Sequence, residues 1–355
     1  MSGGLFITLY DEPTLALYLR CGIYGFLMKP VIKGQPSSRS KHYDALADYA
    51  CSREGTHVFF FLKRKIIYGG RVNGNIEEAS FYLNGETSPL GRNVHAPLFW
   101  DESLRYIPTV TPGVFQVNGI DKAQPFILQF TVIDNLTGKQ ISSDDLYFEL
   151  GKYSYPLPSN SIQGMGFCTL TPGETEIALD LLNRSEKKFN IKNDENIGIG
   201  EKKTLFSSDL IQLSQFINEA NLEFNILTNL KFISELIPDA NYVLCRQVPI
   251  SPFKPFNIDR ADICLYNKDD LIKNGTIPNI IIELKKDKAN FHAYNQISNY
   301  LKWLEKITNE DEFNKITPII VAKNFNINKR KIEKKYYSKI KCFSIETNQA
   351  WFLPE

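Results

Sequence analysis

The chain has 355 residues, of which 43% are hydrophobic, and a formal net charge of +1 at pH 7. A single core usually stops growing at about 250 to 300 residues, so this length predicts two domains, and the hydrophobic content indicates a folded, soluble protein. The near-neutral charge gives no sign of a nucleic-acid partner over the whole chain, so any such contact must be local.

Six cysteines are scattered without CxxC pairs, so neither a zinc knuckle nor a disulfide framework is expected. The chain does not start with a basic segment followed by an apolar one. No run reaches the roughly 18 apolar residues that a membrane helix needs. We therefore expect a cytoplasmic protein without a membrane partner.

Short runs rich in aromatic and β-branched residues dominate the first half of the chain. They predict strands at residues 5–10, 57–62, 66–72, 113–117, 125–133 and 146–150. Helices are predicted at 14–20, at 43–51 and after the capping sequence Thr171-Pro-Gly-Glu174. Residues 1–182 are thus expected to form a β-rich α+β domain, and the polar, lysine-rich residues 183–208 a linker.

Two segments of this domain, Gly55-Thr-His-Val-Phe-Phe-Phe and Ile66-Ile-Tyr-Gly-Gly-Arg-Val, resemble the strand pair of PUA-like domains, including the EVE and ASCH groups. The resemblance implies a barrel with a pocket for a nucleotide or modified base, on which aromatic side chains stack. In the alternative interpretation, the rings of Phe59, Phe60, Phe61 and Tyr68 fill the barrel core. The domain would select the substrate or form a dimer.

The second half of the chain alternates between helical and strand patterns. Helices are predicted at residues 210–236 and 288–306, and strands at 242–248, 261–266, 279–285, 317–323 and 339–345. This order predicts an α/β domain over residues 209–355, a mixed sheet flanked by helices.

The sequence Asn279-Ile-Ile-Ile-Glu283-Leu-Lys285 places a carboxylate and an amine on one face of a strand, because side chains alternate with a period of two. Asp262, on the preceding strand, can supply a second carboxylate. Hard cations such as Mg²⁺, for which Mn²⁺ can substitute, prefer carboxylate and carbonyl oxygen. We therefore expect Asp262, Glu283 and the carbonyl of Leu284 to bind a metal that activates water. The alternative is a surface salt bridge with Lys285 or Arg260.

Further polar residues accompany this set. Gln296 and Tyr300 are four residues apart and share a face of the predicted helix, where Gln296 can bond a water or phosphate. Arg260 can bind a phosphate as a bidentate donor. The predicted opening helix carries two acids, Glu219 and Glu223, which are equally plausible neighbours of this set.

Over residues 219–345 these features resemble the PD-(D/E)xK nuclease superfamily, whose core is a helix, a three-stranded meander, a helix and a further strand. The local sequences are closest to the mismatch endonucleases of the NucS (EndoMS) type: Arg246-Gln-Val-Pro249, Arg260-Ala-Asp262, Glu283-Leu-Lys285 and Gln296 to Tyr300. Ala261 stands where the superfamily name has proline. The resemblance implies Asp262, Glu283, Lys285, Gln296 and Glu223 as catalytic residues, and Arg260, Arg246 and Tyr300 as nucleic-acid contacts.

We therefore expect a Mg²⁺-dependent DNA endonuclease that acts as a homodimer, in restriction or phage defence, with the first domain selecting the target. The alternative is a nucleic-acid-binding or nucleotide-sensing regulatory protein with an inactive or ligand-gated nuclease fold. A basic run from Lys329 to Lys341 fits either a phosphate-backbone track or a solvated helix face. ATP-driven activity is not expected, because no Walker loop occurs.

Overall fold

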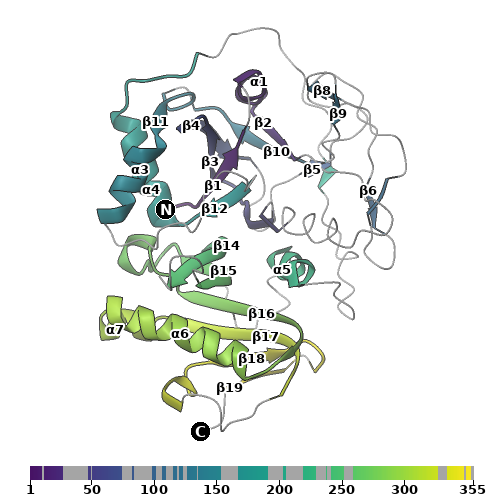
Figure 1. Ribbon diagram of the computed structural model, residues 1–355, viewed down its shortest axis with the longest axis vertical. Coiled ribbons are helices and arrows are strands. Elements are labelled where there is room, and N and C mark those ends of the chain that lie inside the picture. The colour runs from purple at the N-terminus through teal and green to yellow at the C-terminus, as the bar shows by residue number, and fades with distance from the viewer. Residues whose placement is uncertain are drawn as a thin grey trace. The chain divides into compact units, whose positions relative to one another are not determined.

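The computed structural model describes residues 1–9, 12–26, 47–48, 50–73, 82–83, 98–100, 106–108, 115–117, 120–122, 126–133, 135–152, 167–190, 203–204, 219–228, 237, 241–251, 259–326, 334–347 and 349–352. The fold is mixed α/β, with few helices (Figure 1). The chain divides into two compact units. The N-terminal unit comprises Leu5–Leu146 and Ala178–Ile211, and the C-terminal unit comprises Met1–Gly4, Tyr147–Ile177 and Gln212–Glu355. The predicted domain boundaries stay predictions.

In the N-terminal unit the main sheet runs in the order β1 (Gly4–Thr8), β3 (His57–Leu62), β4 (Lys65–Val72), β10 (Phe126–Thr131), β5 (Tyr82–Leu83) and β13 (Lys203–Thr204). In addition, β2 (Ile23–Phe26) pairs with β10, and β11 (Gln140–Ser142) pairs with β4. Two hairpins form separate sheets, β6 (Leu98–Trp100) with β7 (Tyr106–Pro108) and β8 (Phe115–Val117) with β9 (Ile120–Lys122). None of the helices in the described ranges is long and apolar enough to span a membrane.

The predicted hairpin of β3 and β4 is confirmed. Its two turn residues, Lys63 and Arg64, have φ angles of 49° and 62°, which is the left-handed backbone of a type I′ turn. Every residue of β3 is buried. The rings of Phe59, Phe60, Phe61 and Tyr68 all lie in the core. They are not available to stack on a base, so the core interpretation holds for these four side chains.

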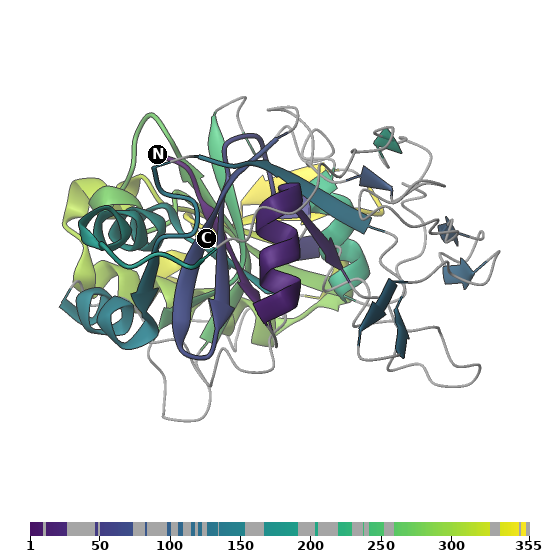
Figure 2. The ribbon, with the colours of Figure 1, turned by 90° about the horizontal axis from the view of Figure 1, so that it is seen from above.

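Helix α1 (Glu12–Cys21) packs beside this hairpin (Figure 2). Tyr18 stacks on Phe60 with the ring centroids 6.1 Å apart, and it meets Tyr24 of β2 edge-on at 5.4 Å. Aromatic pairs in these geometries add to the stability gained from apolar burial. The packing of α1 therefore accounts for part of the aromatic content of this unit.

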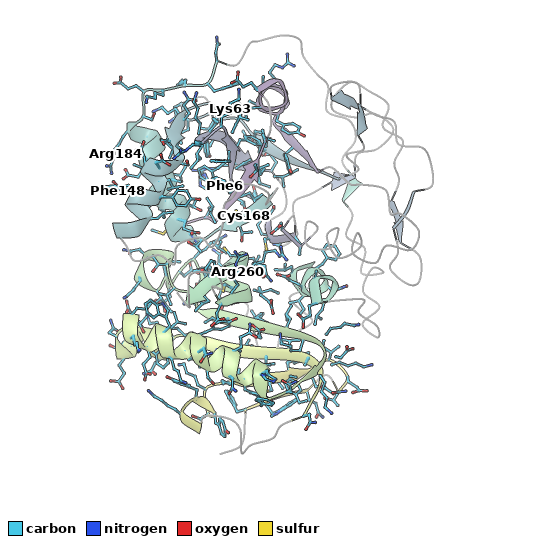
Figure 3. All side chains as sticks on the ribbon, in the orientation of Figure 1. Phe6, Lys63, Phe148, Cys168, Arg184 and Arg260 are labelled. Atoms are coloured by element: carbon cyan, nitrogen blue, oxygen red, sulfur yellow. The ribbon has the colours of Figure 1, made fainter. Side chains whose placement is uncertain are left out.

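Helix α3 (Ser143–Lys152) replaces the strand predicted at residues 146–150, and that prediction is wrong. Leu146 and Leu150 are buried and four residues apart, whereas Phe148 between them is 69% exposed (Figure 3). The acidic first turn, Asp144 and Asp145, favours a helix N-terminus. The adjacent aromatic residues Tyr147 and Phe148 therefore obscured a helical pattern.

The predicted capping box is confirmed at α4 (Pro172–Arg184), which follows β12 (Phe167–Leu170). The backbone N–H of Thr171 donates to Glu174 Oε2 at 2.8 Å, and the backbone N–H of Glu174 donates to Thr171 Oγ1 at 3.3 Å. After α4, Gln140 donates its backbone N–H to the carbonyl of Lys187 at 2.9 Å. The start of the predicted linker is therefore attached to the N-terminal unit, and most of its remainder lies outside the described residues.

The sheet of the C-terminal unit runs β14 (Tyr242–Ser251), β15 (Asp259–Asn267), β16 (Ile280–Ala289), β17 (Thr317–Phe325), β18 (Lys341–Ser344) and β19 (Gln349–Phe352). The first three strands form an antiparallel meander. β17 is parallel to both of its neighbours, β16 and β18, and β19 returns antiparallel to β18. The strand that carries Glu283, β16, therefore lies inside the sheet, not at a solvated edge.

Helices α5 (Glu219–Thr228), α6 (Phe291–Ile307) and α7 (Glu310–Asn314) accompany this sheet (Figure 1). Tyr294, Ile297 and Leu301 of α6 belong to the core cluster that includes Cys264 and Ile281 of the sheet. The predicted start of this helix at Lys288 is wrong, because β16 continues to Ala289 and the side chain of Asn290 caps the helix by accepting the backbone N–H of His292. Of the helix predicted at 210–236, only the part that forms α5 lies within the described residues.

The basic run near the C-terminus is only partly described, since residues 329–331 lie outside the described ranges. Lys335, in the short 3₁₀ helix Lys334–Tyr336, bonds Glu305 of α6 at 2.6 Å. Lys339 places its ammonium 4.6 Å from the ring centre of Phe313. These two lysines have partners within the protein, so the phosphate-track interpretation stays a prediction.

Candidate active site

Two carboxylates face each other on adjacent strands of the C-terminal sheet. The β15–β16 ladder pairs Ile263 with Ile282, so the next position sets Asp262 opposite Glu283. The backbone N–H of Leu284 donates to Asp262 Oδ2 at 2.7 Å. Where the backbone ladder between β15 and β16 ends, the side chain of Asp262 thus accepts the N–H of Leu284 in place of a backbone carbonyl. Glu283 is 1% exposed, whereas Asp262 keeps partial exposure.

Lys285 shares a face of β16 with Glu283, as the period of two predicts. Its Nζ lies 2.8 Å from Glu283 Oε1 and 3.7 Å from Oε1 of Glu219, the first residue of α5. The Lys285 side chain is 25% exposed. The ammonium therefore lies between a buried carboxylate and a half-exposed one. An exposed salt bridge, the alternative drawn from the sequence, does not describe this pair.

Tyr300 and Gln296 of α6 support Glu283 from the helix side. The Tyr300 hydroxyl lies 3.2 Å from Glu283 Oε2 and 2.6 Å from the backbone carbonyl of Arg260, and it accepts from Gln296 Nε2 at 2.8 Å. A hydroxyl has one proton, so Tyr300 donates either to Glu283 or to the carbonyl. Tyr300 is fully buried, and this argues against the nucleic-acid contact predicted for it. Arg260 is half-buried (Figure 3).

Glu223 and Arg246 form a buried ion pair apart from these carboxylates. Arg246 Nε donates to Glu223 Oε1 at 2.9 Å, and its second guanidinium nitrogen lies 2.7 Å from Oε2. Arg246 is 8% exposed and Glu223 is 3% exposed. Glu219, not Glu223, is the acid of α5 beside Lys285, and the catalytic role predicted for Glu223 stays a prediction. The burial of Arg246 likewise argues against its predicted contact with nucleic acid.

Gln247 belongs to the site, although its residue type alone did not single it out. Its side-chain Nε2 donates to Asp262 Oδ1 at 3.1 Å. Its φ angle is 50°, which is left-handed backbone within strand β14. The available signal was a polar residue on an apolar strand, directly after Arg246. The left-handed backbone itself leaves no mark on a sequence when the residue is not glycine or asparagine.

The electrostatics of the carboxylates reflect their crowding. Burial, and after it the nearby Asp262, raise the pKa of Glu283 to about 8 against the opposing effects of Lys285 and Tyr300. Burial also raises the pKa of Asp262, against the hydrogen bond from Leu284 and the charge of Lys285. Burial lowers the pKa of Lys285, but Glu283, Asp262 and Glu219 outweigh it, so this pKa lies above its ordinary value. The site thus favours a cation over a second negative charge.

Within the described ranges, no group of three or more His, Cys, Asp or Glu residues forms a metal-binding cluster. Comparisons of the chain with protein-family models, with curated proteins and with solved structures found no match. Function is therefore inferred from the side chains and from the strand order that positions them.

Proposed function

We propose that the C-terminal unit is a Mg²⁺-dependent nuclease domain of the PD-(D/E)xK type that hydrolyses DNA phosphodiester bonds. The observation that carries this proposal is Asp262 opposite Glu283 on adjacent strands, with the Lys285 amine 2.8 Å from Glu283. The order α5, β14, β15, β16, α6, β17, with an antiparallel meander and then a parallel strand, supports it. This is the element order of the superfamily that the sequence resembles.

The donor set fits a hard divalent cation. Asp262 and Glu283 offer carboxylate oxygen, the backbone carbonyl of Leu284 offers a third oxygen, and Mg²⁺ and Mn²⁺ favour such ligands. Burial raises the pKa values of both carboxyl groups, Asp262 adds to the rise for Glu283 and Glu219 to the rise for Asp262, and a cation would offset this repulsion. When bound, the cation neutralises charge on the phosphoryl group and acidifies water.

The remaining residues position groups and balance charge. Lys285 stabilises negative charge that develops on the phosphate or orients the attacking water. Glu219 is the second carboxylate near the Lys285 ammonium. It is therefore placed to pair with that ammonium when Glu283 binds a metal cation instead. Tyr300, held by Gln296, fixes Glu283 against α6. Arg260 precedes Asp262 by two residues and supplies a phosphate contact at the site.

The biological setting extends this proposal. The first 182 residues would select the target or form the contacts of a homodimer, since two cuts in a duplex need two active sites. Restriction or phage defence is the context we propose for such a protein. The N-terminal unit could also hold a nucleotide or modified base, with residues other than its four buried aromatic rings.

A digestion panel of plain, methylated, mismatched and single-stranded DNA, with Mg²⁺, Mn²⁺ or EDTA, tests the proposal. Asp262→Asn and Lys285→Met should each lower the cleavage rate by about 100-fold or more, because each removes charge from the reacting centre. Asp269→Asn and Lys306→Met are matched controls at exposed positions of the same unit and should cut as the parent does. Undiminished cleavage by Asp262→Asn, or cleavage in EDTA, would refute the assignment.

A further inference from the structure

Building on the proposed function, we infer that Gln247 is a positioning residue whose side-chain amide orients Asp262 for cation binding. Gln247 touches neither substrate nor metal in this scheme and acts through Asp262. The contact that carries the inference is the 3.1 Å hydrogen bond from Gln247 Nε2 to Asp262 Oδ1.

The backbone at Gln247 is unusual for a strand. The β14–β15 ladder pairs Arg246 with Ile263 and Val248 with Ala261, so Gln247 stands opposite Asp262 between these two pairs. Its φ angle of 50° is one that a non-glycine residue rarely adopts, and glutamine has no special preference for it. Strained backbone of this kind persists only where the surroundings enforce it, and it concentrates at functional sites.

The surroundings enforce it through Arg246, the preceding residue. The guanidinium of Arg246 is held by both oxygens of Glu223. Its backbone N–H donates to Thr169 Oγ1 at 3.0 Å, and the Thr169 hydroxyl lies 3.3 Å from its carbonyl oxygen. Side chain and backbone of Arg246 are thus fixed together. The buried pair of Glu223 and Arg246 therefore has a role at the site, as the anchor of the Gln247 turn.

Core residues of β14 flank Gln247 on both sides. Val243 and Cys245 belong to the core cluster before it, and Val248 and Ile250 belong to it afterwards. Gln247 itself is only partly buried, and its side chain is directed at Asp262. A glycine would adopt this backbone without strain, so the glutamine side chain gives the position its chemical role.

The two donors to Asp262 come from opposite sides of its strand. Leu284 of β16 holds Oδ2 with a backbone N–H, and Gln247 of β14 holds Oδ1 with an amide. Together they fix the plane of the carboxylate, and each oxygen keeps a lone pair for a cation. A neutral amide does this without adding a positive charge that would repel the metal. Partners of this kind commonly contribute a factor of about 10 to 100 to metal affinity.

The decisive variants separate the amide from the backbone. Gln247→Gly accepts the left-handed conformation and removes the amide, whereas Gln247→Asn accepts it and holds an amide that is one methylene too short. Gln349→Gly and Gln349→Asn, at an exposed position of β19, are matched controls. Mn²⁺ binding to the full chain by calorimetry, thermal unfolding in EDTA, and cleavage rate against Mg²⁺ concentration are measured for each.

For both Gln247 variants we expect an unchanged or higher melting temperature and a Kd for Mn²⁺ that is about 10-fold weaker. The cleavage rate at saturating Mg²⁺ should fall less than the metal affinity does. If Gln247→Gly binds Mn²⁺ as the parent does, the inference is overturned, whether or not the parent cuts DNA. If Gln247→Gly weakens Mn²⁺ binding while the parent cuts no nucleic acid, the inference stands and the proposed function fails. A parent that takes up no Mn²⁺ overturns both.

Discussion

Glu283→Gln should change how the stability of the metal-free protein depends on pH. The folded chain holds the proton of Glu283 up to about pH 8, because burial and Asp262 raise the pKa from 4.5. The unfolded chain releases that proton near pH 4.5. Between these two values the folded state binds one more proton than the unfolded state does. The free energy of unfolding therefore falls as the pH rises through this window.

The size of the effect follows from proton linkage. A difference of one proton lowers the free energy of unfolding by about 1.4 kcal/mol for each pH unit. From pH 5.5 to 7.5 the parent should therefore lose roughly 2 to 3 kcal/mol that Glu283→Gln does not lose. The glutamine keeps the volume of the side chain, its amide oxygen can accept from Lys285, and its amide nitrogen can donate to the Tyr300 hydroxyl. It should be less stable than or equal to the parent at pH 5.5, and more stable at pH 7.5.

Urea unfolding in EDTA at several pH values measures this difference. Trp303 and Trp351 lie in the C-terminal unit and Trp100 in the N-terminal unit, so a Trp100→Phe background confines the fluorescence signal to the unit of interest. Glu346→Gln, an exposed position of the same unit, is the control and should follow the parent at every pH. Parallel pH profiles for the parent and Glu283→Gln would refute the claim that Glu283 is protonated in the metal-free fold.

Three further predictions concern stability. Arg246→Met should destabilise the C-terminal unit by about 3 kcal/mol in urea, because it leaves Glu223 buried without its partner. The double variant with Glu223→Leu should recover most of this loss, and a double variant as unstable as the single one would contradict the reasoning. Burial and the charge of Arg71 lower the pKa of His57 to about 4, so the N-terminal unit should lose stability as the pH falls from 6.5 toward 4, by up to about 1.4 kcal/mol for each pH unit. His57→Gln should flatten that acid-side slope in pH-dependent unfolding, and an unchanged slope would place the protonation elsewhere. Thr171→Val removes one half of the capping box and should cost about 1 kcal/mol in thermal or urea unfolding, whereas Thr171→Ser should cost less.

The order of elements in the C-terminal half could be anticipated because its strands and helices carry clear periods. The period of two places Glu283 beside Lys285, and the spacing between Asp262 and Glu283 suits a return to the neighbouring strand. The boundaries of these elements are harder to predict. The helical pattern starts at Lys288, although Asn290 caps the helix two residues later.

The partners of the polar residues could not be read from the sequence. Glu219 and Glu223 are one turn apart on α5, and tertiary packing decides that the first approaches Lys285 and the second Arg246. Tyr300 has the residue type of a ligand contact, but the core encloses it. Gln247 adopts a left-handed backbone conformation for which glutamine has no preference, so its residue type does not predict its role. Side-chain roles at a site thus depend on burial, which emerges only from the assembled fold.

The place of β16 within its sheet has a consequence for local opening of the molecule. Its backbone amides are held on one side by the antiparallel β15 and on the other by the parallel β17. Ladders of this kind open only when the whole cooperative unit opens, so amide protons from Ile280 to Ile282, where both ladders are paired, should be among the slowest to exchange with solvent. Fraying at the sheet ends, at β19 for example, would leave Asp262 and Glu283 in register. The carboxylates therefore lie directly beside the part of the unit that is last to lose its structure.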